Sequence, residues 1–244
     1  MRALLPYAVD DPDLWEVYQP PDGPWIRANM VASADGAATA DGRAQGLSND
    51  TDRHLFRMLR AMSDVVLVAA GTVRDEKYGP VKLPAEMTAR RTAAGRSEQP
   101  TLAIVSGSLQ LDWGSRLFTE STTRPLVITS SAADPTRRAQ AEEVADVVIA
   151  GEEKVETGEV RRALVERGLP RILTEGGPSF LGQLVADGGL DELCLAISPR
   201  LAGAGAPRIV TGPAAALTEM TVVSVLEDDG FLYVRYVRAD RATS

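Results

Sequence analysis

The stretch ILTEGGPSFLGQL, residues 172–184, decides how this chain is expected to fold. A short apolar run ends in an acid, two glycines and a proline, and an amphipathic pattern begins directly after them. A buried strand that passes through glycines into a helix is the unit from which parallel α/β sheets are built. We therefore predict a strand at 171–175, a turn at Gly176–Gly177–Pro178, and a helix that ends at Val185.

The rest of the chain repeats this alternation of strand and helix. Short apolar runs predict buried strands, and apolar residues spaced by three and four predict helices. The pattern predicts further strands at 25–33, 64–70, 101–105, 125–129, 146–150 and 191–198, and helices at 48–62, 134–144 and 160–167. Residues 79–99 show no clear period and are expected to form a surface excursion.

The last part of the chain changes character. The segment TVVSVLEDDGFLYVRYVR, residues 221–238, consists of two β-rich runs joined at Asp228–Asp229–Gly230, which is a hairpin signal. We expect this antiparallel pair to close one edge of the sheet. The predicted fold class is α/β, with three αβα layers, a mostly parallel central sheet and a C-terminal antiparallel hairpin.

Length and composition agree with an ordinary globular protein. The 244 residues are 44% hydrophobic and 25% charged, which is far from disordered or fibrous classes. Residues 1–23 are rich in proline and aspartate and are expected to form an arm that packs on the domain or on a second subunit. Residues 24–240 contain no linker strong enough to divide them, so we predict a single domain there.

Charge and composition exclude several kinds of function. The formal charge of -8 gives a negative field that disfavours nucleic acid and anionic membranes as partners. No apolar run reaches about 18 residues, and the N-terminal segment lacks the order of a secretory signal, so we expect a cytoplasmic protein. A single cysteine, Cys194, and a single histidine, His54, cannot form a closed zinc site, so no metal is predicted.

The glycine turn at Gly176–Gly177 suits a phosphate group. Backbone N–H groups at the carboxyl edge of a parallel sheet, next to a helix start, attract anions, and a side chain there would hold the phosphate away. A tight turn needs glycine for reasons unrelated to a ligand, so both interpretations stay open at this point. A second junction, with Gly71 and the Thr72 hydroxyl, lies at the same kind of place and favours a long, doubly anionic ligand.

These segments resemble a known family. ASADG at 32–36, LRAMSD at 59–64, GTV at 71–73, LTEGGP at 173–178 and DEL at 191–193 are similar to the reductase domain of riboflavin biosynthesis. The resemblance runs in order from about residue 25 to residue 237. It implies a dihydrofolate reductase-like fold, NADPH as the cofactor and a pyrimidine substrate.

The resemblance also implies which residues meet the cofactor. Thr72 and Glu76, with Gly71 beside them, match positions that hold NADPH at the second junction, and Ser106 falls near the adenosine ribose or its phosphate. Val31 and Ala32 would lie under the nicotinamide. The segment expected to wrap the pyrophosphate consists of Gly176, Gly177, Pro178, Ser179, Phe180 and Leu181.

On the substrate side, the resemblance implies a contact from Glu175 and a phosphate contact from Arg60, while Asp35 would order the loop that covers the nicotinamide. We name Glu175 and Asp35 as the catalytic candidates. A carboxylate at the end of a buried strand needs a partner or a ligand to stay charged, which independently favours Glu175 as a binding group.

The chain departs from the family pattern at several substrate positions. Ala44 and Gly46 replace a serine and a tryptophan, and EKYGPVK at 76–82 replaces the family's D-D-P-x-L-T-x-R. Lys82 is expected to stand in for the arginine as a second phosphate contact, although it cannot grip a phosphate bidentately. The ligands of the zinc deaminase found in bifunctional relatives are absent from this sequence, so we expect a reductase domain by itself.

The predicted function is NADPH-dependent reduction of the ribosyl group of 5-amino-6-(5-phosphoribosylamino)uracil to ribityl. Two alternatives remain: a reductase of a pterin or dihydrofolate-like ring, and a non-catalytic NADPH-binding protein. The resemblance further implies a homodimer, with the hairpin and the strand DELCLAIS at 191–198 as its surface.

Overall fold

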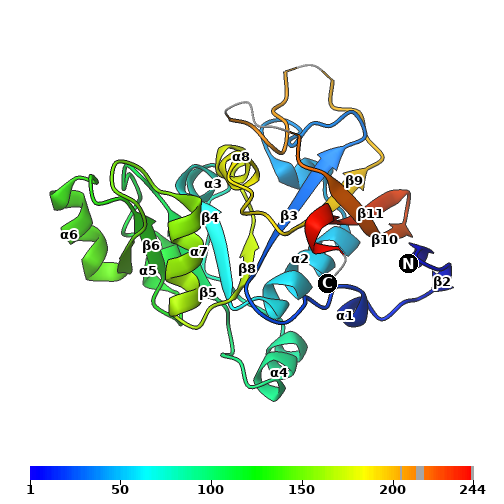
Figure 1. Cartoon of the computed structure of the whole chain (residues 1–244), viewed down its shortest axis with the longest axis horizontal. Helices are drawn as coiled ribbons and strands as arrows, with labels where there is room; N and C mark the ends of the chain where they lie inside the picture. Colours follow the sequence, from blue (N-terminus) through cyan, green and yellow to red (C-terminus); the bar gives the residue numbers. More distant parts are fainter. Residues whose placement is uncertain (204, 213–216, 243–244) are drawn as a thin grey trace. The chain divides into compact units, whose positions relative to one another are not determined.

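A computed structural model describes residues 1–203, 205–212 and 217–242 of the chain, traced in Figure 1. The chain divides into two compact units. The first unit comprises Met1–Leu59 and Pro178–Ser244, and the second unit comprises Arg60–Gly177. One boundary falls inside helix α2 (Asp50–Met62), and the other separates Gly177 from Pro178.

The first unit contains a mostly antiparallel sheet with the strand order β2-β1-β10-β11-β9-β3. Only β9 and β3 run parallel to each other; the other neighbours are antiparallel. The strands are β1 (Arg2–Leu5), β2 (Val9–Asp10), β3 (Trp25–Ser33), β9 (Glu192–Ser198), β10 (Met220–Asp228) and β11 (Phe231–Arg238).

The predicted hairpin is confirmed, but its expected place at the sheet edge is wrong. Asp229 and Gly230 form a two-residue loop in which both φ angles are positive, 50° and 76°, as a type I′ turn requires. Beyond β10, however, lie β1 and β2 from the N-terminal arm. They cover backbone groups that β10 would otherwise expose. The arm was not predicted to contain strands because these have only four and two residues.

Helix α2 begins after a residue whose side chain caps it. Asn49 Oδ1 accepts a hydrogen bond from Asp52 N at 2.8 Å, so α2 begins at Asp50, two residues after the predicted start. The remaining helical segments of this unit are α1 (Leu14–Val17), η1 (Ala44–Leu47), α8 (Pro178–Ala186) and η2 (Ala239–Arg241).

The second unit contains a parallel sheet with the order β8-β4-β5-β6-β7. Because all five strands run the same way, their carboxyl ends meet at one edge. The strands are β4 (Val65–Ala69), β5 (Thr101–Val105), β6 (Leu126–Thr129), β7 (Asp146–Ile149) and β8 (Arg171–Thr174), each within one residue of its prediction. The helices are α3 (Ala70–Asp75), α4 (Ala85–Ala93), α5 (Arg116–Thr119), α6 (Pro135–Val144) and α7 (Thr157–Glu166).

Helix α4 corrects the prediction that residues 79–99 form an excursion without regular structure. Its buried residues are Met87 and Arg91, and the second of these is charged. A helix whose inward side is partly cationic shows no apolar period, so the pattern that finds other helices could not find this one.

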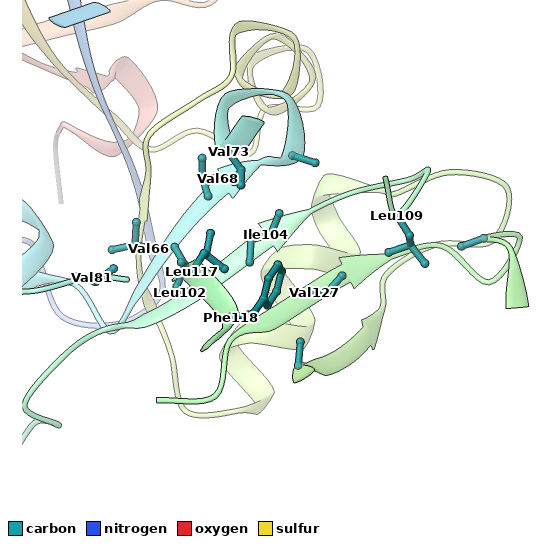
Figure 2. Close-up of a cluster of buried hydrophobic side chains, with 13 residues drawn as sticks. Val66, Val68, Val73, Val81, Leu102, Ile104, Leu109, Leu117, Phe118 and Val127 are labelled. Atoms are coloured by element: carbon teal, nitrogen blue, oxygen red, sulfur yellow. The ribbon is translucent and has the colours of Figure 1, made fainter. Parts of the chain in front are cut away.

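The core of the second unit packs on both faces of the parallel sheet. Figure 2 shows the side chains of Val66, Val68, Leu102, Ile104 and Val127 gathered on one face with Leu117 and Phe118 of α5. The strand residues that alternate with these, such as Val65, Leu67 and Ala103, are also fully buried. Burial on both faces explains the continuous apolar runs in the sequence.

Candidate active site

The glycine turn lies at the carboxyl edge of the second unit. Strands β8 and β4 are parallel neighbours, with Leu67 opposite Thr174, so the segments that follow them leave the sheet side by side. Ala69 N donates to Gly176 O at 2.9 Å, and the Gly176–Gly177 peptide bond is cis. The turn therefore packs against the start of α3, as two adjacent strand ends require.

Gly177 has no room for a side chain. A Cβ atom at this position would lie 2.7 Å from Thr72 Oγ1, closer than a real Cβ contact allows. The two junctions singled out in the sequence, Gly71–Thr72 and Gly176–Gly177, therefore meet. The main chain of Gly177, which has no side chain, lies close to the hydroxyl of Thr72.

The other predicted cofactor residues of the second unit differ in accessibility. Gly71, Thr72 and Glu76 are half-buried in and after α3. Ser106 follows β5 on the same edge, but it is buried, and its hydroxyl accepts a hydrogen bond from Leu109 N at 3.0 Å. Thr72 and Glu76 are thus partly accessible to solvent, whereas Ser106 is buried and its hydroxyl accepts a hydrogen bond within a turn.

In the first unit, the predicted cofactor residues lie on β3 and α8. Val31 and Ala32 pair with Ala196 and Ile197 of β9. The first turn of α8 contains Pro178, Ser179, Phe180 and Leu181, of which Ser179 is exposed while Phe180 and Leu181 are buried. Phe180 and Leu181 can therefore meet a ligand only through backbone N–H groups.

Asp35 ties two loops of the first unit together. Its carboxylate accepts hydrogen bonds from the Ser33 hydroxyl, from Ala202 N at 3.1 Å and from Gly203 N at 2.9 Å. The Ser33 hydroxyl first, and then these amides, lower the pKa of the Asp35 carboxyl to about 2. The group is therefore ionised at neutral pH and is suited to ordering a loop rather than to donating a proton.

Glu175 forms an ion pair with Arg60. The guanidinium Nε lies 2.6 Å from Oε1, and Nη2 lies 2.7 Å from Oε2, which is a bidentate geometry. The Glu175 side chain is 2% exposed and the Arg60 side chain 16%. Burial by itself lowers the pKa of Arg60, but the charge of Glu175 and the hydrogen bonds to it raise the pKa above its usual value.

Tyr78 is a third member of this cluster, and the sequence analysis did not select it. Its hydroxyl donates to Glu175 Oε2 at 2.5 Å, and the Arg60 Cζ lies 5.7 Å from the centre of its ring. Burial, and next the charge of Glu175, raise the pKa of the Tyr78 hydroxyl well above its usual value. The sequence held one clue to Tyr78: it is the aromatic residue in EKYGPVK, residues 76–82, the segment that departs from the family pattern.

Lys82 lies in a surface ion pair. Its Nζ is 3.7 Å from Glu120 Oε2, and its side chain is 66% exposed. The structure thus brings Glu175 and Arg60 together, adds Tyr78 to them, and pairs Lys82 with a residue at the end of α5.

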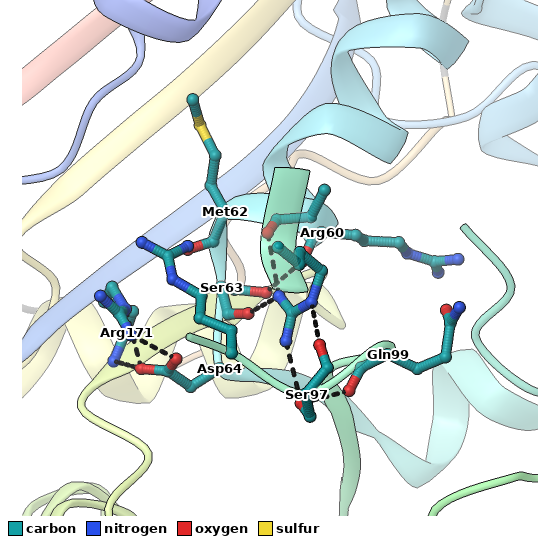
Figure 3. A network of polar contacts seen from close by, with 10 residues as sticks. Arg60, Met62, Ser63, Asp64, Ser97, Gln99 and Arg171 are labelled. Carbon is teal, nitrogen blue, oxygen red and sulfur yellow. Dashed lines mark hydrogen bonds and ion pairs between the residues drawn. The ribbon is translucent and has the colours of Figure 1, made fainter. Parts of the chain in front are cut away.

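The end of α2 that carries Arg60 is held by two further arginines, in the network drawn in Figure 3. Arg91 donates to the carbonyl oxygens of Ala61, at 2.9 Å, and Ser63, and Arg96 donates to that of Met62 at 2.7 Å. These contacts satisfy carbonyls that a helix end leaves unpaired. Burial, and next the charge of Arg96, lower the pKa of Arg91 to about 10, so Arg91 is still a cation at neutral pH.

Among the described residues, no three histidine, cysteine, aspartate or glutamate side chains gather closely enough to hold a metal ion. Within the same parts of the chain, no helix has the length and apolar character needed to cross a bilayer.

Residues 24–231 match the model of a protein family described as the RibD C-terminal domain. The chain belongs to this family. A reductase of 2,5-diamino-6-ribosylamino-4(3H)-pyrimidinone 5′-phosphate from Archaeoglobus fulgidus is 27% identical over 78% of this chain and 87% of its own. A protein of the same name from Methanothermobacter thermautotrophicus is 26% identical over 74% of this chain and 80% of its own.

Solved structures agree with this family. A pyrimidine reductase-like protein from Corynebacterium diphtheriae superimposes with a TM-score of 0.79, at 30% identity, over 88% of this chain and 92% of its own. The riboflavin biosynthesis reductase of Saccharomyces cerevisiae gives 0.67 at 17% identity, over 92% of this chain and 95% of its own, which is a likeness of fold alone. The predicted family and the predicted α/β fold class are both confirmed.

Proposed function

We propose that the chain is an NADPH-dependent reductase of riboflavin biosynthesis. It would reduce the ribosyl group of a phosphoribosylamino-pyrimidine to ribityl, with 5-amino-6-(5-phosphoribosylamino)uracil as the predicted substrate. The family match over residues 24–231 carries this proposal, and the archaeal relatives, named as reductases of the corresponding diamino-pyrimidinone phosphate, support it.

The residues at the carboxyl edge of the second unit fit the phosphate-bearing part of such a cofactor. The backbone of Gly177 is packed where a Cβ atom would collide with Thr72 Oγ1, so main-chain groups rather than side chains line this place. We propose that this backbone, Thr72 and Glu76 hold the pyrophosphate and its ribose. The bound nicotinamide supplies the hydride.

The protein's own groups would orient the substrate and organise the loops. Arg60 and Glu175 are the proposed substrate contacts, and Asp35 holds the loop after β3. Neither Asp35, with its pKa of about 2, nor Tyr78, whose pKa lies well above its usual value, is suited to donate a proton at neutral pH. We propose that ordered water supplies the proton that accompanies the hydride.

Thermal melting with and without NADPH tests the cofactor half of this proposal. A ligand that binds only the native state raises the free energy of unfolding, by about 2.7 kcal/mol when its concentration is a hundred times Kd. The melting temperature must therefore rise. NADH at the same concentration is the matched control, since the two differ only in the 2′-phosphate. Absence of any shift with either nucleotide would contradict the proposal.

Turnover of three substrates tests the other half. We expect NADPH oxidation with the phosphoribosylamino-uracil, with the diamino-pyrimidinone phosphate as the comparison and dihydrofolate as the negative control. Oxidation with dihydrofolate alone would replace the pyrimidine by a pterin-like ring. Binding of NADPH without turnover of any of the three would favour a non-catalytic protein.

We also propose a cytoplasmic homodimer. The exposed apolar side chains Tyr7, Val9 and Val222, which are 78%, 48% and 39% exposed, lie on or between the outer strands β1, β2 and β10. Exposed apolar side chains on the outer strands of a sheet suit association with another copy. Light scattering at several protein concentrations would measure the oligomeric state.

A further inference from the structure

Helix α4 contains no residue of the proposed site, yet the segment that it begins, residues 85–99, binds the end of α2. We propose that Arg91, together with Arg96, is a positioning residue for substrate binding that acts by fixing the last turn of α2. That turn carries Arg60, and the position of its backbone determines how Arg60 meets Glu175. The role rests on the proposed function, in which Arg60 and Glu175 contact the substrate.

The end of α2 has carbonyl oxygens that the helix itself cannot satisfy, because no N–H group follows one turn further along. Three carbonyl oxygens in succession, at and directly after this end, accept from the two arginines. Arg91 Nη1 donates to Ala61 O at 2.9 Å and to Ser63 O, and Arg96 Nη1 donates to Met62 O at 2.7 Å. Cations at this place also oppose the partial negative charge of a helix C-terminus. The last turn of α2 is therefore fixed from outside by one neighbouring segment.

Arg91 joins two segments through one guanidinium. Besides its bonds to the end of α2, its Nε donates to Ser97 O at 2.8 Å and its Nη2 to Ser97 Oγ at 3.1 Å. The residue is 2% exposed, and within the described parts of the chain its hydrogen bonds go to uncharged oxygens. An apolar side chain would fill this place without the desolvation cost of a cation. An apolar side chain could not bind the carbonyls, which indicates that the arginine serves the placement of α2.

Arg60 and Glu175 are placed by different parts of the second unit. Glu175 follows β8, and its N–H donates to Leu67 O of β4 at 3.1 Å, so the parallel sheet holds it. Arg60 lies two residues before the last residue of α2, and its own carbonyl accepts from Ser63 Oγ at 2.8 Å. Figure 3 shows its side chain extending away from the network that binds the helix end. The two positioning arginines therefore act on the backbone that carries Arg60 and not on its guanidinium.

The geometry between Arg60 and Glu175 leaves little tolerance. Both hydrogen bonds of the bidentate pair, at 2.6 and 2.7 Å, lie at the short end of the usual range. A helix end that moves by about 1 Å would lengthen or break one of them, and misplacement of this size costs up to about 10²-fold in rate. The proposed cofactor contacts at Thr72 and Gly177 follow β4 and β8 instead. Loss of Arg91 should therefore weaken substrate binding and leave cofactor binding unchanged.

Steady-state kinetics of Arg91→Met in the full chain test this role. Methionine keeps much of the buried apolar contact and removes every N–H group. With saturating NADPH and the pyrimidine phosphate that the wild type prefers, we expect KM to rise about 5- to 20-fold while kcat changes less than about threefold, as for loss of a binding contact. The Kd of NADPH, measured by calorimetry, should stay within about twofold of the wild type. A merely structural role would lower the amount of folded enzyme, and with it the apparent kcat, and would leave KM unchanged.

Arg124→Met is the matched control. Arg124 Nη2 donates to Glu142 O at 2.7 Å and to Ala145 O at 3.2 Å, so it binds the end of α6 much as Arg91 binds the end of α2. Helix α6 carries none of the proposed site residues. Loss of Arg124 should therefore change the substrate KM less than about twofold.

Two milder variants keep the test decisive if Arg91→Met does not fold. Arg91→Lys keeps the charge but lacks the planar fork that reaches Ala61, Ser63 and Ser97 together. Arg96→Met removes only the bond to Met62 O. For both variants we expect the substrate KM to rise about two- to fivefold.

Three outcomes would overturn the positioning role. The first is an unchanged substrate KM in Arg91→Met that circular dichroism shows to be folded, or, if this variant is unfolded, in both milder variants. The second is an equal loss of affinity for NADPH, which would indicate a general distortion of the unit. The third is a rise in KM of the same size in Arg124→Met.

Each of these outcomes leaves the proposed function intact, because the wild-type chain still turns over its substrate. A wild-type chain that oxidises NADPH with no pyrimidine phosphate would overturn the proposed function and the positioning role together.

Discussion

Each unit of the molecule contains one buried glutamate paired with arginine, and the two clusters differ in instructive ways. In the second unit, Glu175 meets Arg60 and Tyr78. In the first unit, Glu192 accepts from Trp25 Nε1 at 2.8 Å and pairs with Arg27 Nη2 at 2.9 Å and Arg235 Nε at 2.7 Å. The Glu192 side chain is fully buried, whereas the Arg60–Glu175 pair reaches the surface through Arg60.

The Glu192 cluster has a structural role. Arg27 also donates to Tyr18 O at 2.8 Å, and Arg235 donates to Val17 O, so the cluster ties the N-terminal arm to the sheet. Burial by itself raises the pKa of Glu192, but the charges of Arg27 and Arg235 outweigh this and bring the pKa to about 2. Two cations on one carboxylate keep this joint in the core charged at neutral pH.

Position along the strand accounts for the difference. Glu192 is the first residue of β9, at its amino end, whereas Glu175 follows the last residue of β8, at its carboxyl end. Ligands of open α/β sheets bind outside the carboxyl ends of the strands. A glutamate–arginine pair at the amino end of β9 therefore has a structural role, whereas a similar pair at the carboxyl end of β8 is a candidate binding group.

The largest expected effect is on stability. Glu192→Ala leaves two buried arginines without a counter-charge and should lower the free energy of unfolding by about 3–5 kcal/mol. Glu175→Ala leaves one arginine that can reach water and should cost about 1.5–3 kcal/mol. Urea denaturation followed by circular dichroism measures both. The control is Glu166→Ala, whose partner Arg162 is an exposed i,i+4 neighbour; it should change little. Equal losses at Glu192 and Glu175 would break the comparison.

Acid should affect the Glu192 joint next. A folded pKa of about 2, below the usual 4.5, stabilises the fold fully above pH 4.5, and this contribution is lost as the pH falls from about 4.5 towards 2. The difference corresponds to about 3 kcal/mol. Urea midpoints measured between pH 6 and pH 3 should fall more steeply for the wild type than for Glu192→Gln. Parallel curves for the two proteins would show that the joint does not titrate.

Gly177→Ala tests the carboxyl edge of the second unit, where Glu175 lies. The new Cβ atom would collide with Thr72 Oγ1, so either the Thr72 side chain or the turn must move. We expect NADPH affinity, measured by calorimetry, to fall about tenfold or more, a loss of at least about 1.4 kcal/mol. Gly79→Ala is the matched control, since a Cβ there meets open space. A folded Gly177→Ala protein with unchanged NADPH affinity would contradict the cofactor assignment.

The smallest effect is expected at Lys82. Its ion pair with Glu120 is exposed on both sides, so Lys82→Met should leave stability nearly unchanged and alter kcat/KM less than about threefold. Steady-state assays with the phosphorylated substrate measure this. A tenfold rise in KM would place Lys82 on the phosphate, as the sequence suggested.

Most of the secondary structure followed from local patterns. Strands buried on both faces, such as β4 and β5, are continuous apolar runs, and α2 and α6 begin directly after Asn49 and Asp134, which cap them. Elements whose stability comes from distant partners were missed. Strands β1 and β2 need the edge of β10, and α4 is buried through Arg91, which binds carbonyls about 30 residues away in the chain.

The candidate site divides in the same way. Strand-to-helix junctions in the sequence indicate the carboxyl edge of a parallel sheet. This pattern allowed four site residues to be predicted from the sequence: Thr72, Glu175, Gly176 and Gly177. Two contacts could not be predicted from the sequence: the close approach of Gly177 to Thr72, and the hydrogen bond from Tyr78 to Glu175, which is 97 residues away in the chain. Such contacts depend on strand order, which local composition does not contain.

The amino-acid sequence by itself determined the family, through the motifs that resemble it. It also determined the α/β class and the places where a side chain would not fit, because short-range periodicity and glycine carry that information. The tertiary structure alone decided which charges meet. Glu175 and Glu192 look alike in the sequence, and only the pairing of strands and the burial of their partners distinguish a candidate binding group from a structural ion pair, since ion pairing depends on distance and solvent access.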